Sequence, residues 1–133
     1  LVIDYNPEII EGLKKEKISC MYGDMSNLEI LRRINFKEAK VVISTIARES
    51  DNLALLGYIK DIRSNALIIM TAANSEQALT LYEKGADYVL VPAVKTGEII
   101  SSLLEKYMDK KKLLQKLKQT HIKNLQSSNK EKS

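Results

Sequence analysis

The sequence predicts an α/β domain in which a doubly wound parallel sheet carries helices on both faces. Short apolar segments alternate with segments of helical periodicity through the first 107 residues. Residues 41–43 are β-branched and lack polar alternation, which is typical of a strand buried on both faces of a parallel sheet. Single helices between the strands imply right-handed crossovers. The chain has 133 residues, 44% of them hydrophobic, and is long enough to bury one core.

The first two strands are each expected to lead into a helix. A strand opens the chain at residues 1–3, and Asn6-Pro7-Glu8 then offers an N-cap, a proline at the first helical position and an acid in the first turn. The second strand, residues 18–22, ends in the turn Gly23-Asp24. Residues 26–29 fit a capping box, with serine at the first position and glutamate at the fourth.

The alternation continues to the end of the predicted domain. Further strands are expected at residues 41–43, 67–70 and 88–91. The helices after the third and fourth strands are expected to begin at Ser50 or Asp51 and at Asn74 or Ser75, with Gly85 as a left-handed terminator. Strand and helix thus alternate five times within residues 1–107, which we take as the domain.

A last helix is expected to open at Thr96 and to continue into a basic tail, residues 108–133. Leu114, Leu117, His121 and Leu125 extend one face of this helix, and no proline or glycine follows Gly97. Such an amphipathic extension predicts packing on another subunit or a neighbouring segment, with fraying beyond Ser127.

The net charge of +4 is concentrated in the tail. From residue 105 onward there are nine lysines against three acids, a charge of +6, which leaves −2 for residues 1–104. The rest of the chain has no basic face with interleaved aromatic side chains, so we expect no nucleic-acid partner and a solvated lysine tail. No apolar run is long enough for a membrane span, and no signal peptide is visible.

Polar residues follow three of the predicted strands, and the carboxyl ends of parallel strands are where α/β folds bind ligands. If these strands are neighbours, Asp4, Asp24 and Thr45 converge on one edge of the sheet. Asp4 is either a ribose ligand or a solvated turn residue, and Asp24 either accepts from an adenine amino group or is a turn carboxylate. Ser44 and Thr45 either offer hydroxyls and amides to phosphate or ribose, or are small polar residues that end a strand without binding a ligand.

Several kinds of chemistry lack their motifs. There is no G-x-G-x-x-G and no G-x-x-x-x-G-K-[ST]. The single cysteine, Cys20, has no activating histidine, since His121 lies in the tail, and the two lack the further ligands of a metal site. We therefore expect no enzyme and no metal. Relative to a dinucleotide-binding fold, the first strand, glycine loop and first helix are lost or sit in another segment.

Four segments of the sequence, in their order along the chain, resemble the regulator-of-potassium-conductance family, also called TrkA N-terminal domains. They are VIDYNPEIIEGL, YGDMSNLEIL, AKVVIST and LIIMTAANSEQALTLYEKGADYVLVPAVKTGEII. The resemblance covers roughly residues 1–107. It implies a Rossmann-like sheet lacking its first strand and glycine loop, with a C-terminal helical extension. The implied function is a cytoplasmic regulatory domain, at the inner face of the cell membrane, that senses a nucleotide and controls a potassium channel, an uptake system or a cation:proton antiporter.

The resemblance also implies ligands and partners. The cofactor would be NAD(H), AMP, ADP or ATP, and the partners a membrane cation transporter or channel and a second copy in a homodimer. Asp4 would contact the adenosine ribose, Asp24 and the Met25 backbone the adenine, and Thr45 with the following loop the ribose or phosphate. The implied nucleotide-binding residues are Asp4, Tyr5, Asp24, Met25, Ser44, Thr45 and Ile46.

An alternative is a receiver-like signalling domain, because Gly85-Ala86-Asp87-Tyr88 is similar to that family as well. Receivers need an aspartate at the end of the third strand and a lysine at the end of the fifth. This chain has Ser44 or Thr45 at the first place and Val91-Pro92 at the second. The receiver interpretation therefore requires that the phosphoacceptor and the lysine have been lost.

Overall fold

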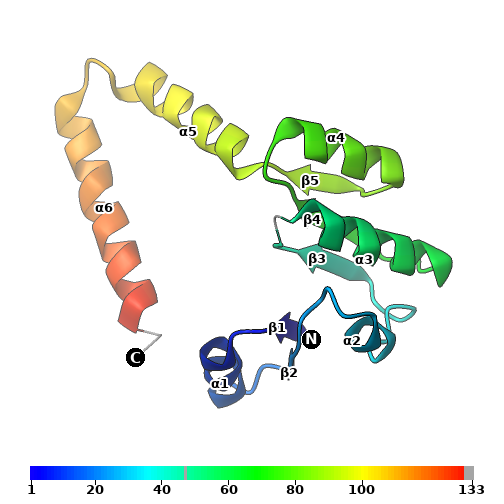
Figure 1. The fold of residues 1–133 in the computed structure, drawn as a ribbon. Coiled ribbons are helices and arrows are strands. Elements are labelled where there is room, and N and C mark those ends of the chain that lie inside the picture. Colours follow the sequence, from blue (N-terminus) through cyan, green and yellow to red (C-terminus); the bar gives the residue numbers. More distant parts are fainter. Residues whose placement is uncertain (47, 131–133) are drawn as a thin grey trace. The chain divides into compact units, whose positions relative to one another are not determined.

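The computed structural model describes residues 1–46 and 48–130 and forms two compact units, Leu1–Lys95 and Thr96–Ser133. The strands lie in the first unit (Figure 1), and their ends carry most of the residues expected to bind a ligand. They are β1 (Val2–Asp4), β2 (Cys20–Tyr22), β3 (Val41–Ser44), β4 (Leu67–Thr71) and β5 (Tyr88–Leu90).

Helices separate the strands in strict alternation, which confirms the α/β class. The helices of the first unit are α1 (Pro7–Lys15), α2 (Leu28–Arg32), α3 (Glu49–Asp61) and α4 (Ser75–Lys84). Helix α5 (Pro92–Tyr107) begins in the first unit and continues in the second, which also contains α6 (Lys111–Lys130). None of the helices in the described part of the chain has a stretch long and apolar enough to cross a lipid bilayer.

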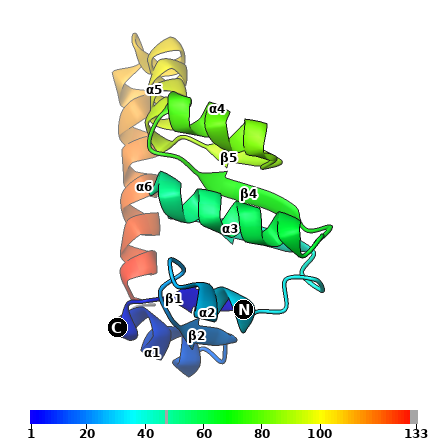
Figure 2. The ribbon, with the colours of Figure 1, turned by 45° about the vertical axis from the view of Figure 1, so that its right-hand side comes forward.

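All strand pairings among the described residues are parallel, as expected, but they form two sheets. β1 pairs with β2, and β3, β4 and β5 form a second sheet in that order. Both views show the β1–β2 pair apart from the other three strands (Figure 1, Figure 2). The condition under which Asp4, Asp24 and Thr45 would follow three neighbouring strands is therefore not met by β3, which pairs with β4.

The core lies between the three-stranded sheet and helices α3 and α4, which pack against each other. The fully buried side chains come from α2, α3, α4 and β4, and the largest apolar ones are Leu31, Leu56, Ile59, Met70 and Leu81. Phe36, in the connection to β3, packs edge to face on Tyr58 with ring centroids 5.9 Å apart. This core holds β3 and β4, and with them the loops at their carboxyl ends.

Several helix ends follow the predicted local chemistry. The side chains of Asn6 and Asn74 cap α1 and α4, accepting hydrogen bonds from the amides of Glu8 and Gln77. Gly85 ends α4 with φ at 102°, a left-handed conformation in which a side chain is strained.

Other helix ends differ from the prediction. The cap of α2 is Asn27, because Asp24 accepts from the Ser26 amide and this turn moves the helix start one residue along. Helix α3 starts at Glu49, with Arg48 at the N-cap and no side-chain cap among the described residues. Helix α5 starts at Pro92, not at Thr96, since proline suits the first turn of a helix.

The C-terminal helices form the second unit. The sequence pattern predicts one continuous helix, but α5 ends at Tyr107 and α6 begins at Lys111. At the end of α5 the backbone amides of Met108 and Lys110 donate hydrogen bonds to the carbonyls of Leu104 and Tyr107. The predicted domain boundary coincides with this break, whereas compactness divides the chain at Lys95. Helix α6 runs to Lys130, so residues 128–130 are helical although fraying was expected beyond Ser127; the rest of that stretch, residues 131–133, lies outside the described residues.

Candidate functional site

The carboxyl ends of β1 and β2 form one side of a polar rim. The amide of Gly23 donates to the Asp4 carbonyl at 3.0 Å, so the residues that follow the two strands are held together. The Asp4 carboxylate is half-buried and accepts from the Asn6 amide at 2.8 Å, while Tyr5 is exposed. The Asp24 carboxylate is exposed and accepts from the Ser26 amide at 2.9 Å. Two carboxylates thus lie where adjacent parallel strands end.

Asp24 is held in its ionised form. Hydrogen bonds from the backbone and side chain of Ser26 lower the pKa of the Asp24 carboxyl below its ordinary value of 3.8, and the positive charge of Arg48 adds a smaller effect in the same direction. This carboxylate is therefore an acceptor throughout the neutral pH range. Arg48 stands directly before α3, so its charge acts on Asp24 from the start of that helix.

The end of β3 is held by a buried polar network centred on Asn52 of α3. Asn52, 1% exposed, donates to the carbonyls of Ile46 at 2.6 Å and Thr71 at 2.9 Å, and accepts from the Ser44 hydroxyl at 2.6 Å. These bonds join β3, the loop after it and the end of β4. The Ser44 hydroxyl is thus a buried partner of Asn52, whereas Thr45 is exposed at the rim.

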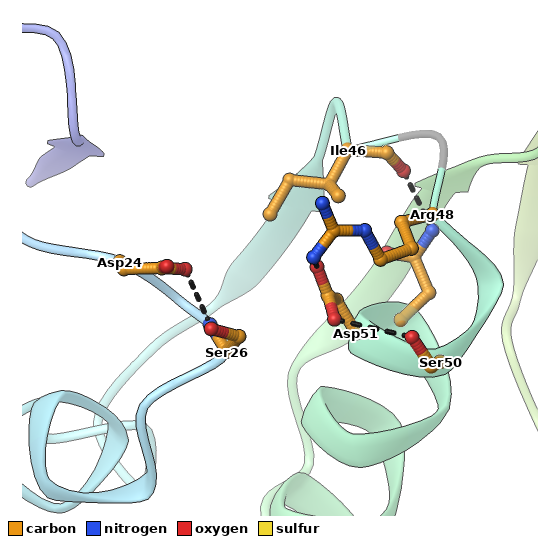
Figure 3. A network of polar contacts seen from close by, with 7 residues as sticks. Asp24, Ser26, Ile46, Arg48, Ser50 and Asp51 are labelled. Atoms are coloured by element: carbon orange, nitrogen blue, oxygen red, sulfur yellow. Dashed lines mark hydrogen bonds and ion pairs between the residues drawn. The ribbon is translucent and has the colours of Figure 1, made fainter.

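Arg48 brings a positive charge to the same rim, and the sequence analysis missed it. Its guanidinium pairs with the Asp51 carboxylate at 3.4 Å, and its side chain is 72% exposed (Figure 3). A cation directly before the helix that follows a strand end is the signal that could have identified it, because anionic groups bind at helix N-termini. Asp24 and Arg48 therefore give the rim both an acceptor and a cationic donor.

A groove of about 530 Å³ lies between β1 and β3. Its wall includes Met25, Ser44, Thr45 and Ile46 of the predicted site; Asp4, Tyr5 and Asp24 are not among the lining residues. The other lining residues are Leu1, Val2, Ile3, Ile34, Asn35, Phe36, Glu38, Ala39, Val41, Val42, Ile43 and Leu55. The groove is thus mostly apolar, and Thr45 and Ile46 of the rim are among its lining residues.

The two edges of this groove are strand edges. The Val2 amide donates to Ser19 and the Asp4 carbonyl accepts from Gly23, so the backbone of Ile3, between them, faces away from β2. Likewise the Lys40 carbonyl accepts from the Leu67 amide, and the alternation along β3 turns the backbones of Val41 and Ile43 away from β4. The unpaired edges of β1 and β3 thus line the groove, and each offers backbone donors and acceptors to a further strand.

No metal centre is apparent in the described part of the chain. No group of three or more His, Cys, Asp or Glu side chains is placed to hold a metal ion there. Cys20 is half-buried, and its thiol lies 3.8 Å from the Ile10 carbonyl. His121 lies in α6, in the other unit.

Comparison with known proteins finds both similar sequences and similar solved structures. The chain is 27% identical over 103 residues to the glutathione-regulated potassium-efflux system protein KefC of Escherichia coli O139:H28, covering 74% of this chain but only 17% of KefC. It thus spans about a sixth of that relative's length.

Solved structures show the same fold. The TrkA-N domain of the inner membrane protein ybaL from Escherichia coli superposes with a TM-score of 0.71 at 20% identity, covering 77% of this chain and 76% of that one. The GsuK channel gives a TM-score of 0.67 at 26% identity over 82% of this chain and 28% of that one. Other structures of GsuK are described as bound to NAD and to ADP.

The family assignment rests on the match of most of the first unit to a single domain type. Residues 1–92, which include all five strands and the rim at the ends of β1, β2 and β3, match the TrkA-N domain. This chain therefore belongs to the TrkA-N domain family.

Proposed function

We propose that this chain is a regulatory domain, not an enzyme, that binds an adenine nucleotide at the rim formed by Asp4, Asp24, Thr45 and Arg48. The observation that supports the proposal is that two carboxylates, an exposed threonine and an exposed guanidinium all lie just beyond the carboxyl ends of β1, β2 and β3. This is where ligands bind in open α/β sheets. The NAD and ADP complexes of GsuK support the same class of ligand.

Each rim residue has a role that suits its chemistry. Asp4 accepts from the ribose hydroxyls, and Asp24 with the Met25 backbone receives the adenine, because an ionised carboxylate is an acceptor for hydroxyl and amino donors. Thr45 and the backbone of Ile46 contact the ribose or phosphate, and Tyr5 flanks the ribose side. Arg48, which is already paired with an acid at the surface, offers its guanidinium to phosphate oxygens.

The groove between β1 and β3 indicates what completes the site. Both edges present backbone groups, so a strand between them would join the two sheets into one. A strand, a glycine loop and a helix, supplied by a segment outside residues 1–133, would also bring the backbone amides that cradle a diphosphate. We refer to the chain joined ahead of Leu1 to such a unit as the extended chain.

The nucleotide would regulate transport by favouring one of two arrangements of the paired domains. We propose that the domain works as a homodimer on the cytoplasmic side of a membrane cation transporter or channel, as part of it or bound to it, which the relation to KefC and GsuK supports. A nucleotide shifts the equilibrium between two arrangements of the paired domains only if it binds one of them more tightly. A coupling of ~1 to 3 kcal/mol changes the equilibrium constant between the two arrangements about 5- to 150-fold.

The phosphate role of Arg48 is tested by calorimetric titration of the extended chain with ADP and with adenosine. We expect Arg48→Ala to weaken ADP binding about tenfold, since a charge-assisted hydrogen bond at a partly exposed site contributes about 1.4 kcal/mol. Adenosine binding should stay unchanged, because adenosine has no phosphate.

Arg33→Ala is the matched control, because Arg33 is also an exposed arginine but lies at the C-cap of α2 and not at the rim. It should leave the ADP affinity as it is. Equal weakening of ADP and adenosine by Arg48→Ala would contradict a phosphate contact. Absence of binding of ADP, NADH and AMP to the extended chain would remove the nucleotide proposal altogether.

A further inference from the structure

Helix α6 has an apolar stripe along one side. At 100° per residue, Leu113, Leu114, Leu117 and Leu125 fall within an arc of about 120°, with His121 among them; Ile122 lies about 60° outside this arc. These four leucines expose 39% to 54% of their surface, so the structure leaves the stripe uncovered. In a helix that no described element covers, such a stripe indicates a surface that packs on something else.

The same helix is strongly cationic. Between residues 111 and 127 there are five lysines and no aspartate or glutamate: Lys111, Lys112, Lys116, Lys118 and Lys123. On the helical projection Lys118 borders one side of the leucine stripe and Lys116 borders the other, while Lys112 and Lys123 lie opposite. The partner that covers the stripe must therefore be apolar at its centre and negatively charged around it.

We propose that α6 binds the surface of an anionic lipid bilayer, lying in the headgroup plane with its leucines among the upper acyl chains. A bilayer offers apolar contact directly beneath a layer of negative charge, and amphipathic helices that combine an apolar stripe with a lysine-rich polar face bind there. The bordering lysines extend their methylene stems along the apolar boundary and keep their ammonium groups at the phosphates.

Two other occupants fit the helix less well. A second copy of α6 would bring lysines of the two helices together, because α6 has no acid between residues 111 and 127 to pair with them. A nucleic acid would attract the lysines but would leave the leucine stripe exposed to water. The inference goes beyond nucleotide binding and does not depend on it, since the first unit takes no part in the contact.

The experiment is co-sedimentation of the whole chain, without nucleotide, with phosphatidylcholine vesicles that contain or lack phosphatidylglycerol. We expect binding only to the vesicles that contain phosphatidylglycerol, weakened by added salt. Changing Lys112, Lys116 and Lys118 to glutamine should lower the partition coefficient about 100-fold, because each lysine near the membrane surface contributes about a factor of five. Glutamine keeps the helix propensity close to that of lysine, so helicity serves as the check that α6 survives.

Further variants separate the bilayer from its alternatives. The double change Leu114→Gln with Leu117→Gln should abolish vesicle binding while leaving all lysines in place. Three lysines of the first unit form the matched control, and their change to glutamine should have little effect: Lys15, Lys37 and Lys40. Retained binding in the leucine variant, equal binding to neutral vesicles, equal affinity for duplex DNA, or a leucine-dependent dimer without vesicle binding would each overturn the proposal.

Discussion

Replacing Asn52 by leucine is expected to lower the free energy of unfolding by about 3 kcal/mol. Asn52 is 1% exposed and has hydrogen bonds to the Ser44 hydroxyl and to the carbonyls of Ile46 and Thr71. Leucine fills a similar volume but leaves these buried groups without their partner, and each unsatisfied group costs about 1 to 3 kcal/mol. Urea denaturation followed by circular dichroism measures the loss.

A second substitution separates hydrogen bonding from packing at this position. Asn52→Asp keeps the shape, but at neutral pH its carboxylate would face the two carbonyls as an acceptor with no proton to donate. We expect a loss at pH 7 at least as large as that of the leucine variant, and a smaller loss at low pH, where the protonated acid can donate. Ser50→Ala, at an exposed position of the same helix, is the control. A loss below about 0.5 kcal/mol for both Asn52 variants, the range of ordinary surface changes, would contradict the anchoring role.

Truncating Leu81 to alanine is expected to cost about 2 to 5 kcal/mol, because the side chain is fully buried between α4 and the three-stranded sheet. Leu79 is the matched control on the same helix, since it is 64% exposed. Its truncation should change the free energy of unfolding by no more than about 0.5 kcal/mol. The shift in urea midpoint between the two variants reports the difference. Equal shifts would show that α4 does not pack on the core as described.

The elements that the sequence predicts well are those with a local cause. Asn6 and Asn74 cap their helices, and Gly85 takes the left-handed conformation, because each effect depends on one residue and its immediate neighbours. The parallel sheet follows from apolar strands separated by single helices. Residues 1–92 match the TrkA-N domain, so the predicted family is confirmed as well.

The misplaced helix starts have causes that lie in competing local bonds. Ser26 fits a capping box by spacing, but its amide is taken by the Asp24 carboxylate, so Asn27 becomes the cap. The last helix was expected to open at Thr96, but it begins at Pro92, two residues after the end of β5. The sequence pattern alone does not rank such alternatives, because both use residues of the right type.

The site shows the same division between local and tertiary information. Strand ends identified Asp4, Asp24 and Thr45 as rim residues, since the carboxyl end of a strand can be read from the pattern. Arg48 and Asn52 were missed because their roles depend on how the loop after β3 lies against β2 and β4. The separation of β3 from β1 was likewise invisible in the pattern, because it depends on which edges pair.

The most direct test of the nucleotide site is the affinity of the extended chain for AMP and NADH, measured by calorimetry for wild type and Asp4→Ala. We predict at least tenfold weaker binding of both ligands, because the carboxylate that would accept from the ribose is removed and this contact is common to them. Asp4→Asn, which keeps an acceptor for the Asn6 amide, separates ligand binding from damage to the turn, and Glu8→Ala controls for net charge. Unchanged affinity in Asp4→Ala, with both nucleotides still bound, would contradict the proposed binding of adenosine at this rim.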